Sequence, residues 1–130
     1  MKVITFIGDV HASHITPSSR KDEYPLIILD KLSKVPEISP SDRYIFLGDF
    51  THQPILPIKY LHKIVACMVE NYQGKAYSIV GNHDIPRDKI EKLNETAMGV
   101  LFKAGVINHL YNLKFRAGET QYRVYGHDFG

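Results

Sequence analysis

The sequence is poor in cysteine, with Cys67 as its single example among 130 residues. One cysteine cannot form an internal disulfide, so a fold that depends on such bridges is excluded. Cys67 falls within an apolar pattern of helical spacing, where it is expected to act as a small buried hydrophobic residue. With 44% hydrophobic and 23% charged residues, the chain has the length and composition of one domain with an ordinary core.

Long apolar runs are also missing. The first run, Val3 to Ile7, has five residues and is interrupted by Gly8-Asp9. A helix that spans a bilayer needs about 20 apolar residues, and a signal peptide needs a longer apolar stretch than this one. We therefore expect a cytoplasmic protein without a membrane partner.

The chain has little net charge. Its 16 basic and 14 acidic residues give 16 − 14 = +2, and the basic residues are scattered. This balance neither requires nor excludes a nucleic-acid partner. The mixed-charge stretch 87–92 is typical of a solvated surface. Four basic residues fit either contact with a phosphate backbone or ordinary surface charge: Arg20, Lys21, Arg87 and Lys89.

Strands and helices are predicted to alternate in the first part of the chain. Apolar and β-branched runs predict buried strands at 2–7, 43–47 and 76–80. The first strand is apolar on both faces, so we expect it to be central and covered on both sides. Between the strands, helical spacing predicts helices at 22–35, stopped by Pro36 and Pro40, and at 57–72.

The last third of the sequence predicts a further helix and three short strands. The helix begins at Asn94 or Glu95 and ends at Lys103, and a strand at 106–110 follows. A hairpin is predicted with arms at 111–115 and 121–125. No linker, repeat or low-complexity tract interrupts the chain. These elements predict an α/β fold with a parallel βαβαβ core and an appended β-hairpin, in a single domain over 1–130.

Polar residues follow each of the first three predicted strands. They are Asp9 and His11, then Asp49, then Gly81-Asn82-His83-Asp84. Gly81 is expected to let the backbone turn, and Asp9 and His11 point the same way if the chain there stays extended. Each motif alone also fits a helix cap or an ordinary turn. Together they predict a metal site, because the carboxyl ends of parallel strands share one edge of the sheet.

The order Asp-x-His, Gly-Asp, Gly-Asn-His-Asp resembles the signature of the calcineurin-like metallophosphoesterases. In this sequence the motifs are separated by 49 − 9 = 40 and 82 − 49 = 33 residues. The resemblance implies the αββα sandwich of that family, with these residues as its N-terminal half. It also implies two divalent ions, with Asp9 and His11 on one, Asn82 on the other and Asp49 bridging them. Such ligands suit Mn²⁺ first, with Fe²⁺, Zn²⁺ or Ni²⁺ as alternatives.

The same resemblance implies hydrolysis of a phosphate ester. A hydroxide held by the two ions would attack phosphorus, His83 would protonate the leaving oxygen, and Asp84 would orient His83. The protein-phosphatase triplet Asp-Arg-Gly is absent after Gly48-Asp49, where the sequence has Phe50-Thr51-His52. The sequence is therefore more similar to the nuclease and the bacterial or phage phosphodiesterase branches, and the implied substrate is a nucleic acid or a nucleotide. The oligomeric state is left open.

The resemblance is incomplete, since the family pattern continues with three more histidines. Gly126-His127-Asp128-Phe129 matches the last motif only in part, so His127 is expected at a strand end rather than as a ligand. His52 fits either the rim of the site or the surface, and His14 and His62 are expected at the surface. The chain is thus expected to be the first part of a longer enzyme. The alternative is a non-catalytic module that keeps the fold for binding.

Overall fold

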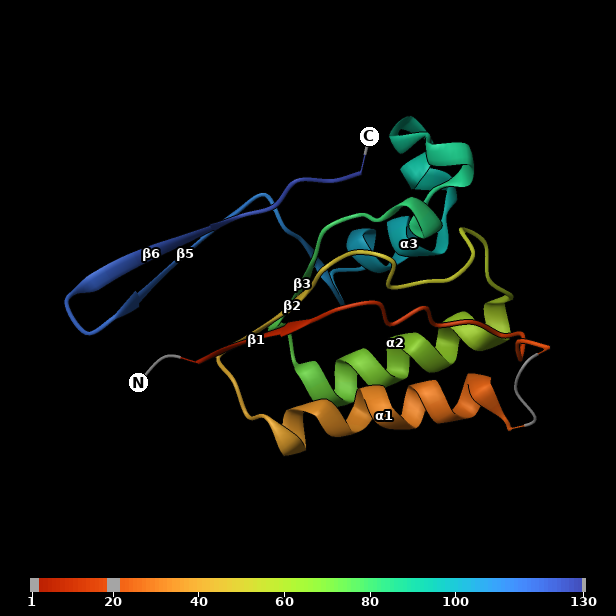
Figure 1. Ribbon diagram of the computed structural model, residues 1–130, viewed down its shortest axis with the longest axis horizontal. Coiled ribbons are helices and arrows are strands. Elements are labelled where there is room, and N and C mark those ends of the chain that lie inside the picture. The colour runs from red at the N-terminus through yellow and green to blue at the C-terminus, as the bar shows by residue number, and fades with distance from the viewer. Residues whose placement is uncertain (1–2, 19–21, 130) are drawn as a thin grey trace.

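The computed structural model describes residues 3–18 and 22–129. Its main sheet has four parallel strands in the order β1-β2-β3-β4, namely β1 (Ile4–Ile7), β2 (Arg43–Phe46), β3 (Ala76–Ser78) and β4 (Asn108–His109). The sheet follows the order of the chain (Figure 1). All four carboxyl ends therefore lie at one edge. Lys2, at the start of the first predicted strand, lies outside the described residues. So do Arg20 and Lys21, two of the four basic residues considered for phosphate contact.

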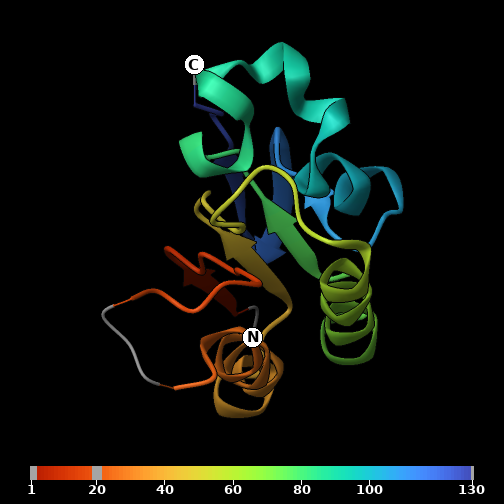
Figure 2. The same ribbon diagram turned by 90° about the vertical axis from the view of Figure 1, so that its right-hand side faces the viewer.

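Three helices cover one face of this sheet. They are α1 (Tyr24–Ile38), α2 (Ile58–Tyr72) and α3 (Ala97–Lys103), each in the connection between two successive strands. Figure 2 shows α1 and α2 side by side. Right-handed connections that always advance to the next strand place every helix on the same face. The main core lies between the two layers and includes Tyr44, Phe46, Ala76, Leu32, Ile64 and Met98.

The opposite face of the sheet is covered only in part. An antiparallel hairpin of β5 (Asn112–Ala117) and β6 (Thr120–Tyr125) contributes Leu113 to a small second cluster around Ile45. On the same face, Phe6 is 55% and Leu47 52% exposed. The prediction that the first strand is central and covered on both sides is therefore wrong: β1 is an edge strand of the described sheet. Its apolar pattern reflected side chains on both faces, of which Ile7 and Ile4 are partly buried and Phe6 is exposed.

Helix α1 differs from its prediction at Pro36. The helix continues through this proline to Ile38, although proline lacks the N–H that would bond to the carbonyl four residues earlier. That carbonyl belongs to Leu32, and it accepts a hydrogen bond of 2.7 Å from the Tyr72 hydroxyl of α2. A neighbouring helix supplies the missing donor, so Pro36 does not end the helix.

The stretch between β3 and α3 folds as three short 3₁₀ turns, η1 (Asn82–Asp84), η2 (Pro86–Asp88) and η3 (Ile90–Glu95). Helix α3 begins after them, where Thr96 Oγ1 accepts from Gly99 N at 3.0 Å. β3 and β4 are shorter than predicted, whereas the βαβαβ core and the hairpin are confirmed. No helix in the described part of the chain is long and apolar enough for a membrane crossing.

Candidate metal centre

The first two site loops are fixed at both of their ends. β1 and β2 pair up to Ile7 and Phe46, and the two chain segments pair again at Ala12 and Thr51. His11 N donates to Asp49 O at 2.9 Å between these points. The loops that carry the predicted ligands are therefore part of the sheet's continuation and not free surface segments.

Within these loops three polar residues have left-handed backbone conformations. The φ angles are 46° at Asp9, 50° at His11 and 50° at Asp49. Such a conformation costs a residue with a side chain about 1–2 kcal/mol, and it is often retained at functional sites. The chain at Asp9 and His11 is thus not extended, and the predicted reason for their convergence is wrong. Their side chains nevertheless come within 3.7 Å of each other.

Asp9, His11 and Asp49 form a cluster of possible metal ligands at this edge. His11 Nε2 lies 3.7 Å from Asp9 Oδ1 and 3.9 Å from Asp49 Oδ2. One ligand atom from each residue lies within 4.8 Å of the others. The Asp9 side chain is 82% exposed and that of Asp49 only 18%, so one carboxylate faces solvent while the other is held in the protein. Two carboxylates and an imidazole are a donor set that suits a divalent cation.

Asn82 places its amide beside the Asp49 carboxylate. The amide nitrogen donates to Asp49 Oδ1 at 3.2 Å and to Oδ2 at 3.3 Å, because the opposite orientation would bring the amide oxygen against these acceptors. The side chains of Asn82 and Asp49 therefore lie within hydrogen-bond distance of each other. If the amide turned its oxygen toward the carboxylate, a divalent cation could bind between the two groups.

A second cluster consists of three histidines, His11, His52 and His83. Their rings lie 4.9–5.2 Å apart, and His52 and His83 are stacked. His83 Nδ1 lies 3.0 Å from the His52 carbonyl oxygen. A carbonyl only accepts, so Nδ1 carries the proton of this bond and Nε2 is the nitrogen left for a substrate.

His11 and His52 are joined directly through their Nδ1 atoms, 3.1 Å apart. One of the two must donate and the other accept. Burial lowers the pKa of His52, and the neighbouring His83 and His11 lower it further. A neutral His52 can accept from His11 Nδ1, which leaves His11 Nε2 unprotonated and directed at the two carboxylates.

Asp84 does not contact His83 in the way that the sequence predicted. Its Oδ1 accepts from the backbone N and the hydroxyl of Thr51, both at 2.9 Å, and its Oδ2 accepts from Gly81 N at 2.9 Å. Burial raises the pKa of Asp84, against the opposing effect of these hydrogen bonds. As the third residue of η1, Asp84 turns back to the start of that turn, so it joins two site loops rather than orienting His83.

Gly81 lies in close contact with Asp49. Its φ of −95° is available to any residue, so the prediction that glycine serves a sharp turn there is wrong. A methyl group at position 81 would collide with Asp49 Oδ1 and Asp49 N. His83 N also donates to Asp49 Oδ1, at 2.9 Å. The third site loop therefore packs directly on the carboxylate of the second.

The remaining histidines lie outside both clusters. His62 and His127 are exposed, and His14 Nδ1 is buried without a hydrogen-bond partner in the described part of the chain. His109 pairs with Asp128 Oδ2 at 2.7 Å, and Asp128 Oδ1 accepts from Val80 N at 2.8 Å, directly before the third site loop. His52 is the residue whose place sequence reasoning left open, and its position three residues after Asp49 was the available signal.

An open cleft lies beside the clusters. It has a volume of about 290 Å³ and is lined by Asp9, His11, Ser13, Pro17, Tyr24 and His52. The Tyr24 hydroxyl donates to His11 O at 2.9 Å, which fixes one wall of the cleft to the site. A substrate in the cleft would have direct access to both clusters.

A comparison with protein families gives a match whose range includes all the site residues. A family model described as calcineurin-like phosphoesterase matches residues 2–129. This range includes every residue of the two clusters and the Asn82 loop. No curated protein sequence matches the chain.

Proposed function

The chain belongs to the calcineurin-like phosphoesterases, and from this premise we propose that it hydrolyses phosphodiesters in a metal-dependent reaction. The observation that carries the proposal is the convergence of Asp9, His11, Asp49, Asn82 and His83 at one edge of the sheet. These residues come from three separate loops. Carboxylate, imidazole and amide ligands beside a further imidazole are what a metal-assisted hydrolase needs.

The ligands divide naturally between two ions. Asp9 and His11 would hold one, Asn82 would hold the other, and Asp49 has one oxygen facing His11 and both oxygens near Asn82, as a bridging carboxylate requires. Divalent ions bound there would supply an activated water as nucleophile and would offset the charge of the phosphate. The donor set fits Mn²⁺ and its neighbours in the first transition series.

His83 is the proposed general acid. Its Nδ1–H is held by the His52 carbonyl, so the ring orientation is fixed, and in the imidazolium form the second proton, on Nε2, can be donated to a leaving oxygen. An alkoxide leaving group, such as the sugar oxygen of a nucleic acid, needs that proton. This need favours phosphodiesters of nucleotides or nucleic acids as substrates.

His52 and Asp84 are proposed to act as positioning residues. Neutral His52 accepts from His11 and bonds to His83 through its backbone, so it connects a metal ligand with the acid. Asp84 connects Thr51 with Gly81 and keeps the loop of His83 against that of Asp49.

A non-catalytic binding module is the second candidate. It is favoured by the 82% exposure of the Asp9 side chain, because a carboxylate that water solvates so fully gains less from binding a metal ion. The arrangement of His83 argues for the enzyme, since binding alone has no need for a proton donor.

The proposal is tested by hydrolysis with millimolar Mn²⁺ of two substrates, bis(p-nitrophenyl) phosphate and a thymidine dinucleotide. Asp49→Asn should abolish both reactions and weaken Mn²⁺ binding measured by calorimetry. His83→Gln should slow the dinucleotide reaction by about a hundredfold or more. It should slow the p-nitrophenyl reaction much less, because p-nitrophenolate leaves without a proton.

His62→Gln provides the matched control, because His62 is an exposed histidine outside the site. Its activity should equal that of the unchanged protein. Mn²⁺ binding without hydrolysis of either substrate would support the binding module. The proposal fails if His83→Gln affects both substrates equally, or if the unchanged protein neither binds Mn²⁺ nor hydrolyses.

A further inference from the structure

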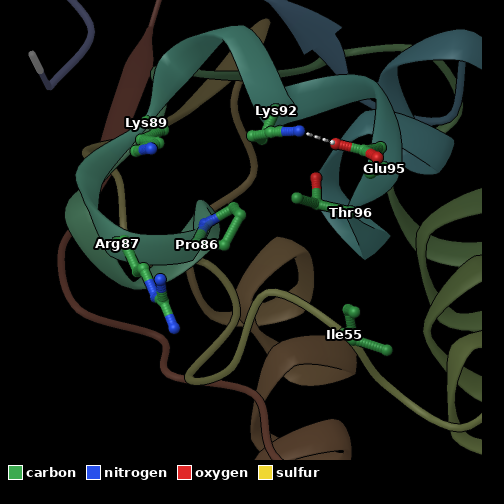
Figure 3. A pocket seen from close by; sticks show the side chains of 7 residues that line it. All are labelled: Ile55, Pro86, Arg87, Lys89, Lys92, Glu95 and Thr96. Atoms are coloured by element: carbon green, nitrogen blue, oxygen red, sulfur yellow. Dashed lines mark ion pairs between the residues drawn. The ribbon is translucent and has the colours of Figure 1, made fainter.

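A basic pocket lies next to the proposed catalytic loops. It has a volume of about 320 Å³, and its wall includes Arg87, Lys89, Lys92 and Glu95. Figure 3 shows these side chains around the curved chain of η2 and η3, with Ile55 on the facing loop. The volume is at the lower end of the range for ligand pockets, enough for a phosphate with part of a nucleotide.

The walls of the pocket continue the loops that carry the site histidines. Ile55 is three residues after His52, and Arg87 is four residues after His83. At the full reach of a chain, four residues span roughly 14 Å, so the pocket is close to His83. Pro54 O accepts from Ala97 N at 2.8 Å, which ties the Ile55 loop to the start of α3. The position of the pocket relative to the metal centre is thus set by backbone contacts.

The pocket carries an excess of positive charge. Its wall contains three basic side chains and one acidic side chain, which gives a local net charge of 3 − 1 = +2. Lys92 Nζ lies 3.5 Å from Glu95 Oε2, but both side chains are at least half exposed, at 50% and 66%. An exposed ion pair of this kind contributes little to stability, so a phosphate can compete for the lysine.

The backbone of Arg87 has a conformation that is rare for a residue with a side chain. Its φ is 50°, a left-handed conformation shared with Asp9, His11 and Asp49 of the site. The sequence predicted a solvated surface for 87–92. Arg87, Lys89 and Lys92 are exposed, in agreement with that prediction, and they also line the pocket, with Arg87 in a conformation that is unfavourable for a residue with a side chain.

We infer that this pocket binds a second, non-scissile phosphate of the substrate while the metal centre holds the phosphate that is cleaved. The inference rests on the proposed function and names its substrate class: nucleotides or nucleic acids that carry at least two phosphate groups. Basic side chains select such substrates by charge, since phosphate contacts fix the position of a nucleic acid without reading its sequence. Substrates with one phosphate cannot reach the pocket and the metal centre at once.

The first test measures binding of a fluorescein-labelled thymidine oligonucleotide by anisotropy, in EDTA, over a range of salt concentrations. Lys89→Gln/Lys92→Gln should weaken binding about tenfold and reduce the slope of log K against log salt by about 0.7 for each phosphate that is no longer neutralised. Glu95→Gln should tighten binding about two- to threefold, because it removes the competing carboxylate. A gain of affinity has no explanation in damage to the fold.

Lys63→Gln/Lys114→Gln serves as the matched control, because it removes the same charge from exposed lysines on α2 and β5. The inference is overturned if this control weakens binding as much as the pocket variant, or if Glu95→Gln leaves binding unchanged. Competition by thymidine diphosphate identifies the source of the phosphate. Equal competition per phosphate indicates small nucleotides, and much weaker competition indicates a polymer.

The second test compares kcat/KM for the oligonucleotide with that for bis(p-nitrophenyl) phosphate, which has one phosphate. The pocket variant should lower the ratio about tenfold, and the control variant should leave it unchanged. Equal losses on both substrates would overturn the inference. If the unchanged protein hydrolyses neither substrate, the proposed function fails, and the anisotropy series still decides whether the pocket binds phosphate.

Discussion

At the scale of single residues, the site depends on a contact that has no sequence signature. Gly81 has an ordinary backbone conformation and is needed because the Asp49 carboxylate occupies the space of a side chain. The same carboxylate also accepts from His83 N at 2.9 Å. Position 81 therefore controls where Asp49 lies, and with it the distance between the two proposed ions.

Gly81→Ala should destabilise the fold by about 1–3 kcal/mol, as overpacking does. It should also weaken Mn²⁺ binding by more than the loss of stability explains, because the new methyl group displaces Asp49. Thermal unfolding with and without Mn²⁺ measures both effects. Gly8→Ala is the control, since a methyl group at Gly8 has no other atom within 4 Å. Equal behaviour of the two variants would contradict the role given to Gly81.

The sequence predicted which polar residues lie at the edge of the sheet, but it did not predict which groups their side chains contact. Asp9, His11, Asp49, Asn82 and His83 follow predicted strands, and parallel strands end at one edge. The pattern could not show where each side chain bonds, because a carboxylate serves equally well as a turn cap or as an imidazole partner.

Asp84 is an example of this limit. It was predicted to orient His83, and its oxygens bond instead to Thr51 and Gly81. With both oxygens held by these donors, neither is directed at the imidazole. His52 is the opposite case, since a residue that fitted the surface as well as the rim lies against both His11 and His83.

At the scale of elements, α1 and α2 are linked through Pro36 and Tyr72. Pro36 leaves the Leu32 carbonyl without its helical donor, and the Tyr72 hydroxyl provides a replacement at 2.7 Å. Tyr72 is 1% and Leu32 4% exposed, so water cannot take over this role. The proline and the tyrosine should therefore be energetically coupled across the two helices.

A double-mutant cycle tests the coupling. Tyr72→Phe should lower the free energy of unfolding by about 1–3 kcal/mol, because it leaves a buried carbonyl unsatisfied. In a Pro36→Ala background the same change should cost about 1 kcal/mol less, since an alanine at this position would restore the helical N–H. Urea unfolding of the four proteins gives the comparison. Additive effects would show that the hydroxyl does not replace the missing helical bond.

This link explains why the predicted end of α1 was wrong, whereas α2 and the hairpin were predicted closely. Helix α2 and the hairpin arms had clear apolar spacing and turn residues, and the structure has them within a few positions. The end of α1 depended on a tyrosine more than 30 residues later, as 72 − 36 = 36. Local pattern cannot include such a partner.

At the scale of the whole molecule, the order of strands was the feature that the sequence described least well. The first three predicted strands are all largely apolar, so the pattern could not distinguish an edge strand from a central one. The sequential order β1-β2-β3-β4 places the helices on one face and leaves Phe6 and Leu47 half exposed on the other. The meeting of the three loops was predictable in spite of this, because any parallel order brings them to the same edge of the sheet.

The free energy of unfolding should fall at alkaline pH, because the core contains a buried thiol and buried phenols. Burial raises the pKa of Cys67 from 9.0 to about 11 and raises the pKa values of Tyr60 and Tyr72 above their ordinary value. Between pH 9 and pH 11 the unfolded chain releases a thiol proton that the folded chain keeps. The contribution of Cys67 to stability is therefore complete below pH 9 and is lost as the pH rises through about 11.

Urea unfolding at a series of pH values between about 8 and 11 tests this dependence. Cys67 alone should account for a loss of about 2 kcal/mol by pH 11, where the folded thiol is half ionised. Cys67→Ala should give a shallower decline, because this variant keeps only the tyrosine contribution. A decline of the same steepness in both proteins would exclude the thiol as a cause.

The chain segments that follow β1 and β2 pair a second time beyond the site loops, and this second pairing limits the length of the loops. Ile7 pairs with Phe46 and Ala12 with Thr51, so 8–11 and 47–50 are enclosed between two points of the same ladder. Surface loops usually accept insertions and deletions. Here an added or missing residue on one side would leave the other side unmatched and would separate Asp9 from Asp49. Equal length on the two sides is thus itself a determinant of the site, as much as the identity of the residues within it.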